Sequence, residues 1–266
     1  MRPAILASLF VALVTSAAFA QAVGDRVRRE QADPASAPEK PSQPAKLNPK
    51  HAVSFYKRGL TRQARGDVDR ALDDFNQAIR FDPQYAPAYF ARGTIRQNKG
   101  EYDKAIADYD EALRLDPQQA AARAQRGIAW HQLGRYEKAI ADLKEAIQQD
   151  AKHVTAHYSL AWLLATCPDA RYRDGKRAVE LATTACELSD WKSPPGILAL
   201  AGASAECGDF DNAVKWQTEF LRLCPEGERK KWDFLLDLYK SRQPFRGARE
   251  ESGFGSVVRQ GREFAA

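Results

Sequence analysis

The sequence APAYFARGTIRQNKGEYDKAIADYDEALRLDPQQ occupies residues 86–119 and is one copy of a pattern that recurs on both sides of it. Two series of glycines repeat at a step of 34 residues: Gly59, Gly93 and Gly127, and Gly66, Gly100 and Gly134. Self-similarity at a fixed period of this length is typical of stacked helical repeats. The spacing therefore predicts an all-α solenoid in which each repeat packs only on its neighbours.

Each copy carries the pattern of two helices. In the second helix, apolar residues follow one another at offsets of 1, 4, 7 and 8, which places them along one side of the helix. The three series are Ala71, Leu72, Phe75, Ala78, Ile79; Ala105, Ile106, Tyr109, Ala112, Leu113; and Ala139, Ile140, Leu143, Ala146, Ile147. The small alanines let paired helices approach closely, while the larger residues fill the space between repeats.

Glycine and proline mark the ends of these helices. Gly66, Gly100 and Gly134 follow the first helix, because glycine accepts the left-handed backbone used at a helix C-terminus. Pro83 and Pro117 end the second helix, since the residue before proline is pushed out of the helical region. The third copy has Ala151 in that place, so we expect either a looser turn or a helix that runs on toward residue 153.

The copy at residues 86–119 resembles the tetratricopeptide repeat (TPR). The residues on that family's signature positions are Tyr89, Gly93, Gly100, Tyr102, Ala105, Tyr109, Ala112 and Pro117. Three copies match closely and two more loosely, over residues 52–227. The resemblance implies a right-handed superhelix of about five helix-turn-helix repeats, closed by a C-terminal capping helix. It also implies a non-enzymatic module that binds a protein or peptide.

The fourth and fifth copies are divergent. The stretch CPDARYRDGKR, residues 167–177, makes the turn of the fourth copy about five residues longer, and we expect an exposed loop at 168–176. In the fifth copy Gln217 and Phe220 replace the usual aromatic and alanine, so packing on the next element is expected to differ. Residues 228–243 are predicted to form a final helix that covers the last repeat.

The chain ends and the repeats give the predicted domain organisation. Residues 1–20 combine Arg2, an apolar run and the sequence Ala18-Phe19-Ala20, which is typical of a cleaved secretory signal peptide. A disordered Pro/Ala-rich linker is expected at 21–50, three regular repeats at 51–153, two divergent repeats with the capping helix at 154–243, and a flexible tail at 244–266. The signal predicts export, to the periplasm if the source is Gram-negative and otherwise by secretion.

The resemblance also implies a concave groove lined by the first helix of each repeat. The residues on the groove positions are Tyr56, Leu60, Phe90, Thr94, Gln97, Asn98, Ala124, Ile128, His131, Gln132, Tyr158 and Trp162. Aromatic side chains supply contact area and amides satisfy backbone groups, so the set suits an extended peptide or a helix from a partner. The alternative is that some of these residues only pack between neighbouring helices.

Charged residues repeat in step with the glycines. Arg58, Arg92 and Arg126 form one series and Asp74, Asp108 and Asp142 another. Pairing within or between repeats is favoured over a basic stripe for an acidic partner. The net charge of +5 is spread among many acidic residues, and no nucleic-acid-binding motif accompanies it, so no nucleic-acid partner is expected.

Catalytic and metal-binding patterns are missing from the sequence. There is no G-x-S-x-G, no P-loop and no H-E-x-x-H, so neither an enzyme nor a cofactor is expected. His153 and His157 are four residues apart, but they have no third ligand nearby and no metal site is expected. No apolar stretch is long enough to span a membrane.

Four cysteines carry the alternative hypothesis, a disulfide-stabilised or redox-sensitive structural module: Cys167, Cys186, Cys207 and Cys224. An exported protein can oxidise cysteines. Helix rise separates the two cysteines of one repeat by roughly 20 Å, which leaves the cross-repeat pairs Cys167–Cys207 and Cys186–Cys224. The main hypothesis is a scaffold or adaptor of the cell envelope; the sequence leaves its partner, its oligomeric state and the role of the 168–176 loop open.

Overall fold

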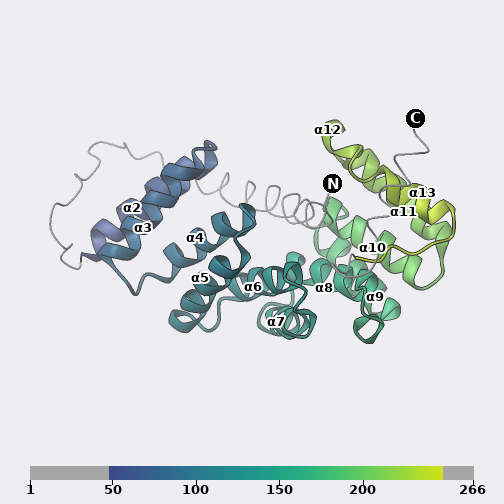
Figure 1. Ribbon diagram of the computed structural model, residues 1–266, viewed down its shortest axis with the longest axis horizontal. Helices are drawn as coiled ribbons and strands as arrows, with labels where there is room; N and C mark the ends of the chain where they lie inside the picture. Colours follow the sequence, from purple (N-terminus) through teal and green to yellow (C-terminus); the bar gives the residue numbers. More distant parts are fainter. Residues whose placement is uncertain (1–47, 248–266) are drawn as a thin grey trace. The chain divides into compact units, whose positions relative to one another are not determined.

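The computed structural model describes residues 48–247, and every regular element in that range is a helix (Figure 1). The predicted signal peptide, the linker up to residue 47 and the tail beyond residue 247 lie outside the described residues. The described part forms two compact units with a boundary between Ala129 and Trp130. They are here called the N-terminal unit (residues 48–129) and the C-terminal unit (residues 130–247).

The N-terminal unit is built from helix pairs in sequence order. Its helices are α2 (Pro49–Ala64), α3 (Val68–Phe81), α4 (Ala86–Asn98), α5 (Tyr102–Leu115) and most of α6 (Ala120–Gln132). Helix α2 packs against α3 and α4 against α5, while α3 also contacts α4. Helix α2 begins two residues before the predicted start of the repeats, because Asn48 caps it and Pro49 suits its first turn.

The C-terminal unit continues the pairing and adds contacts within it. Its further helices are α7 (Tyr136–Gln149), α8 (Val154–Thr166), the short 3-10 helix η1 (Ala170–Tyr172), α9 (Gly175–Leu188), α10 (Pro194–Glu206), α11 (Phe210–Leu223), α12 (Glu226–Arg229) and α13 (Asp233–Lys240). Helix α8 packs against α9 and α10 against α11, and α10 also packs on α8 and α9. These pairs confirm the predicted all-α solenoid fold.

The turns inside the helix pairs are those that the glycines predict. Gly66, Gly100, Gly134 and Gly208 all have a positive φ, between 69° and 80°. At Gly100 the glycine N–H donates to the carbonyl of Gln97, and the next N–H donates to the carbonyl of Arg96. The left-handed glycine thus satisfies carbonyls at the end of α4, as its position in the repeat requires.

The turns between the pairs depend on aspartate as much as on proline. Asp82, Asp116 and Asp150 each end a second helix, with φ of −144°, −136° and −139°. Each carboxylate accepts the N–H two residues later, at 2.9, 3.3 and 3.0 Å. The turn at Ala151 is therefore the same as the others, and neither the looser turn nor the longer helix occurs, because the aspartate side chain closes the turn without proline.

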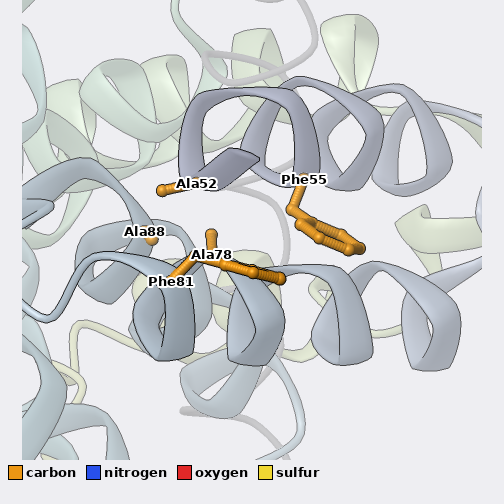
Figure 2. Close-up of a cluster of buried hydrophobic side chains, with 5 residues drawn as sticks. All are labelled: Ala52, Phe55, Ala78, Phe81 and Ala88. Carbon is orange, nitrogen blue, oxygen red and sulfur yellow. The ribbon is translucent and has the colours of Figure 1, made fainter. Parts of the chain in front are cut away.

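The core of the N-terminal unit consists of alanines and aromatic rings from adjacent helices. Figure 2 shows one cluster, in which Phe55 of α2 stacks on Phe81 of α3 with ring centroids 5.4 Å apart. The predicted alanines of this unit, Ala71, Ala78, Ala105 and Ala112, are all fully buried, and so are Ala139 and Ala146 of the C-terminal unit. Gly93 lies over a ring, since a Cβ there would be 2.8 Å from Cε1 of Tyr109. The glycine at this position of the repeat is therefore required by close contact between the two helices.

The insertion in the fourth repeat is more ordered than the sequence predicts. It contains η1, and Asp169 is buried, accepting the N–H of Arg171 at 3.1 Å. Arg173 donates to the carbonyls of Cys167 and Pro168, at 2.9 and 3.3 Å. The expectation of an exposed loop is therefore correct only for some of its side chains, because these bonds hold the insertion against the end of α8.

The capping element is two helices rather than the one predicted over 228–243. Residues 226–229 form α12, and α13 begins at Asp233 after a turn. Trp232 in that turn is buried, with its ring edge-on to Phe220 at 5.7 Å, and its carbonyl accepts from Nε2 of Gln217 at 3.1 Å. Gln217 and Phe220, the two unusual residues of the fifth repeat, thus contact the capping element. The turn at Trp232 places its ring and its carbonyl against them.

Candidate binding surfaces

On α2, the two predicted groove residues are half-buried. Tyr56 packs edge-on against Tyr85 at 5.3 Å and tilted against Phe75 at 5.9 Å. Leu60, one turn later, packs against the cluster around Phe75 and Ala71. Both side chains keep one side exposed while the other is fixed by α3, so they form a rigid apolar surface.

On α4, the four predicted residues differ in exposure. Phe90 is half-buried against Tyr109, with ring centroids 6.0 Å apart, and Asn98 is exposed. Thr94 and Gln97 are only 3% and 1% exposed, and Thr94 donates to the carbonyl of Phe90 at 3.0 Å. Phe90 and Asn98 therefore lie at the surface, and Thr94 and Gln97 support it from beneath.

Gln97 links α4 to α6 and is joined by a residue that the sequence did not single out. Its Nε2 donates to Oε1 of Gln125 at 2.8 Å. Its own Oε1 is buried and has no hydrogen-bond partner among the described residues. A buried amide oxygen without a donor costs about 1–3 kcal/mol. Ile128, also predicted for the groove, is buried at 3% exposure, as is Ala124.

The predicted charge pairs are formed in this unit. Asp74 accepts from Arg58 and Arg62, at 2.7 and 2.8 Å. Asp108 accepts in the same way from Arg92 and Arg96, at 2.6 and 3.0 Å. Both carboxylates are almost completely buried, at 1% and 2% exposure. The arginines of the first helices are thus neutralised from below and do not make a basic stripe.

Pairing also crosses from one repeat to the next. Arg92 donates to Oδ1 of Asn76 at 2.9 Å, and Arg126 contacts Oδ1 of Asp110 at 2.6 Å. Asn76 and Asp110 are themselves 34 residues apart. Both forms of the prediction, pairing within and between repeats, therefore occur.

In the C-terminal unit, His131 is half-buried beside an aromatic group. Its ring lies 6.0 Å from that of Tyr136, which in turn lies 5.9 Å from Tyr172. Although the residue keeps some exposed surface, desolvation of the ring lowers the pKa of His131 to about 4. The imidazole is therefore neutral at physiological pH. Gln132, the next predicted residue, is half-buried.

The two predicted residues of α8 are buried. Tyr158 is 2% exposed, its hydroxyl donates to Oγ1 of Thr155 at 3.3 Å, and burial raises its pKa above the ordinary value. Trp162 is 6% exposed and lies over Gly202 of α10, where a Cβ would come within 3.3 Å of the indole ring. For these two residues, as for Thr94, Gln97 and Ile128, the structure shows packing between helices.

Residues 244–247 cover part of the same surface. The ring of Phe245 lies 5.8 Å from that of Trp162, and the N–H of Gly247 donates to the carbonyl of Thr166 at 2.7 Å. Arg246 forms an ion pair with Glu206, Nη1 to Oε2, at 2.6 Å, although its N–H is not aligned as a hydrogen bond. The first residues of the predicted flexible tail are thus in contact with α8 and α10.

All four cysteines have free thiols. Cys167, Cys186 and Cys224 are buried, and Cys207 is exposed. Burial raises the pKa of Cys186 to about 12. The predicted pair Cys167–Cys207 is not bridged, and the structure gives the disulfide hypothesis no support.

The remaining candidates have structural roles. Nδ1 of His153 accepts the N–H of Ala156 at the start of α8, and Nε2 of His157 lies 3.0 Å from the carbonyl of Ala151. Within residues 48–247, no cluster of histidine, cysteine and acidic side chains is arranged to hold a metal ion. None of the described helices combines the length and apolar character that crossing a bilayer requires.

Several residues at these surfaces do not stand out in the sequence: Gln125, Thr166, Arg173, Glu206, Phe245 and Arg246. Gln125 lies between two groove positions of α6 and belongs to no signature. Glu206 precedes the turn glycine, where repeats vary. The one available signal was Phe245, an isolated aromatic residue in a stretch rich in glycine and arginine.

Two family models match the sequence, both described as tetratricopeptide repeat. One covers residues 56–120 and the other residues 92–174. No curated protein matches the sequence.

Solved structures with a similar fold are more numerous. The Cut9–Hcn1 hetero-tetramer of the APC/C matches 89% of this chain at 19% identity and a TM-score of 0.64, but the chain spans only 41% of that protein's length. The pilF protein of Pseudomonas aeruginosa matches 82% of this chain and 98% of its own, at 19% identity and a TM-score of 0.58. YrrB, described as a TPR protein with an unusual peptide-binding site, matches 73% and 94%, at 16% identity and a TM-score of 0.54. These likenesses concern the fold.

Proposed function

Because the chain is a tetratricopeptide repeat protein, a fold that serves protein–protein interaction, we propose that its N-terminal unit binds an extended segment of a partner along the first helices α2, α4 and α6. The observation that carries this proposal is the mixture of side chains on those helices. Tyr56, Leu60 and Phe90 are fixed from behind by second-helix residues and keep one exposed side. Rigid aromatic and apolar groups of this kind give contact area at a small entropic cost.

The polar part of the surface supports binding of a peptide backbone. Asn98 is exposed one turn beyond Thr94, and Gln97 and Gln125 form a bonded pair between α4 and α6. An exposed amide such as that of Asn98 can pair with backbone groups of a bound segment, which favours an extended peptide over a purely apolar helix.

The arginines of the same helices do not select an acidic partner in this proposal. Arg58, Arg92 and their neighbours already pair with buried Asp74 and Asp108. A ligand carboxylate would have to compete with a bidentate intramolecular pair. We therefore expect the partner segment to be apolar and amide-rich where it crosses α2 and α4.

The role that we propose for the whole protein is a scaffold or adaptor in the cell envelope. The exported location rests on the signal-type sequence of residues 1–20. N-terminal sequencing of the mature protein tests it, with Gln21 as the expected first residue. A mature chain that retains Met1 would contradict export by this signal.

Binding itself is tested by site-specific photo-crosslinking in cells. A photoreactive phenylalanine at position 90 is expected to capture a partner, whereas the same group at Ala107, an exposed position of the second helix α5, is the matched control. Capture that is equal from both positions, or that is unchanged when Leu60 and Asn98 are both replaced by alanine, would contradict the proposed surface.

A further inference from the structure

Residues 244–247, Pro-Phe-Arg-Gly, belong to no repeat, yet they return to the repeats. After α13 ends at Lys240, the chain turns at Arg242 in a left-handed conformation with φ of 56°. Figure 1 shows the segment in yellow as it runs back from α13 past α10. It then meets the C-terminal end of α8, where the carbonyl of Thr166 accepts from Gly247 at 2.7 Å.

Three consecutive residues make three different kinds of contact. Phe245 lies between two rings, tilted on Trp162 at 5.8 Å and edge-on to Phe234 at 5.9 Å. Arg246 pairs with Glu206 at 2.6 Å. Gly247 supplies a backbone donor to a helix-end carbonyl, a group that has no partner within its own helix. Peptide-binding sites combine an apolar pocket, a charge pair and a hydrogen bond to the peptide backbone in this way.

The insertion of the fourth repeat orients the carboxylate of Glu206 toward a cation. Its Oε1 accepts from Nε of Arg173 at 3.0 Å, and Arg173 is itself fixed by the carbonyls of Cys167 and Pro168. The side chain of Glu206 is only 14% exposed, so its charge lies in a partly desolvated place. One oxygen is thus oriented by the protein, and the other faces the arginine of the returning segment.

Trp162 occupies the groove register of the repeat. It lies 34 residues after Ile128, which lies 34 residues after Thr94, and Thr94 follows Leu60 by the same step. Gly202 of α10 leaves room for its ring. The segment 244–247 therefore covers the residue that corresponds in register to Leu60, Thr94 and Ile128, on a surface of the C-terminal unit alone.

We propose that the face made by Trp162, Thr166 and Glu206 is a peptide-binding site for segments with an aromatic residue followed directly by arginine and a small residue, and that residues 244–247 are a built-in ligand that occupies it. A partner segment with the same chemistry binds by displacing the chain's own. This site is distinct from the surface proposed on α2, α4 and α6, and either proposal can fail without the other.

The test uses the mature full-length chain and a labelled peptide with the sequence of residues 243–248. In the wild type the tethered segment is present at a high effective concentration, so the free peptide competes poorly. In the Phe245→Ala/Arg246→Ala variant the site is open, and the peptide is expected to bind at least roughly tenfold more tightly by fluorescence anisotropy. The intrinsic tryptophan fluorescence, to which Trp162 contributes as one of five tryptophans, should return toward its wild-type value as the peptide binds.

Two controls separate a ligand from a structural strap. A peptide in which the phenylalanine and arginine are both alanine should not bind, and adding Glu206→Gln to the open variant should weaken the intact peptide roughly tenfold. Arg222→Ala in the otherwise wild-type chain is the matched control for loss of the Arg246 charge, since it removes a positive charge from the exposed pair with Glu219. It should leave peptide affinity as in the wild type.

The proposal is overturned if the open variant binds the intact peptide no better than the wild type, or binds the alanine peptide equally. If the double variant does not fold, Arg246→Ala alone replaces it, with the same peptide and the same expected direction. Failure of that variant to bind more tightly than the wild type overturns the proposal as well.

Discussion

The first helix of a repeat has different surroundings in the two units. In α4 of the N-terminal unit, six of 13 residues are buried, whereas in α8 of the C-terminal unit eleven of 13 are. Both helices occupy the same place in the repeat. Helix α8 is enclosed because α7, α9 and α10 pack on it, and residues 244–247 lie on part of what remains. One repeat position thus provides a surface in one unit and a core in the other.

The charged residues of the two units follow the same division. Arg92 and Asp108 pair in the second repeat, but the fourth repeat has Leu160 and Leu181 at the corresponding places, at 2% and 3% exposure. An ion pair keeps its arginine partly in water, while two leucines allow another helix to pack there. The fourth repeat thus buries two leucines where the second repeat buries an ion pair, and α10 packs more extensively on α8 and α9 than α4 does on α2 and α3.

The largest expected effect comes from truncating the same groove position in each unit. Trp162→Ala removes a buried ring between Gly202 and Phe245, and should lower the free energy of unfolding by about 3–5 kcal/mol. Leu60→Ala, at a half-buried site, should cost only about 1 kcal/mol. Denaturant unfolding of the two variants measures the difference. Equal losses would mean that the two units do not differ as described.

The next effect concerns the buried carboxylate. Asp108→Asn leaves Arg92 and Arg96 without their counter-charge, and should cost about 2–3 kcal/mol, since the arginines keep some exposure. Glu111→Gln, which removes a carboxylate from the exposed pair with Arg114, is the matched control and should leave the unfolding midpoint unchanged. A similar midpoint for both variants would show that the buried pair contributes no more than a surface pair.

The division between the units explains how much the sequence could predict. Glycine spacing, alanine stripes and the Arg–Asp series depend on contacts inside one repeat or between adjacent ones, so Gly93 and Asp108 were predictable. The contacts of Arg173, Glu206 and Phe245 join segments that the repeat pattern does not relate. Periodicity has no information on such contacts, and for the same reason burial of Trp162 could not be distinguished from exposure by its register.

A smaller effect is expected from acid. Gln63, Gln97 and His131 hold the same position in successive repeats, and only His131 is titratable. Desolvation lowers the pKa of His131 to about 4, so the folded state binds its proton less readily than the unfolded state does. Stability that is complete above the unfolded pKa of about 6.5 is therefore lost as pH falls toward 4, by about 1–3 kcal/mol.

The measurement compares the wild type with His131→Leu between pH 7 and pH 4.5, since carboxylates contribute equally to both. The variant should lose less stability over this range. Parallel curves for the two proteins would contradict a neutral, desolvated His131 and would place that position in water, as an exposed groove residue.

The smallest expected effect is that of reductant. With four free thiols, adding dithiothreitol should not shift the unfolding midpoint of either unit, whereas a Cys167–Cys207 bridge between α8 and α10 would make the C-terminal unit sensitive to it.

Alkylation of the native protein, followed by mass spectrometry, should modify Cys207 alone, because the other three are buried. Partial desolvation, and to a smaller extent the negative charge of Glu206, raise the pKa of Cys207. Its alkylation should therefore be slow at pH 7 and accelerate as the pH rises past the ordinary pKa of a thiol. Modification of Cys167 at a similar rate would mean that the end of α8 is open to solvent, and with it the contact between Thr166 and Gly247.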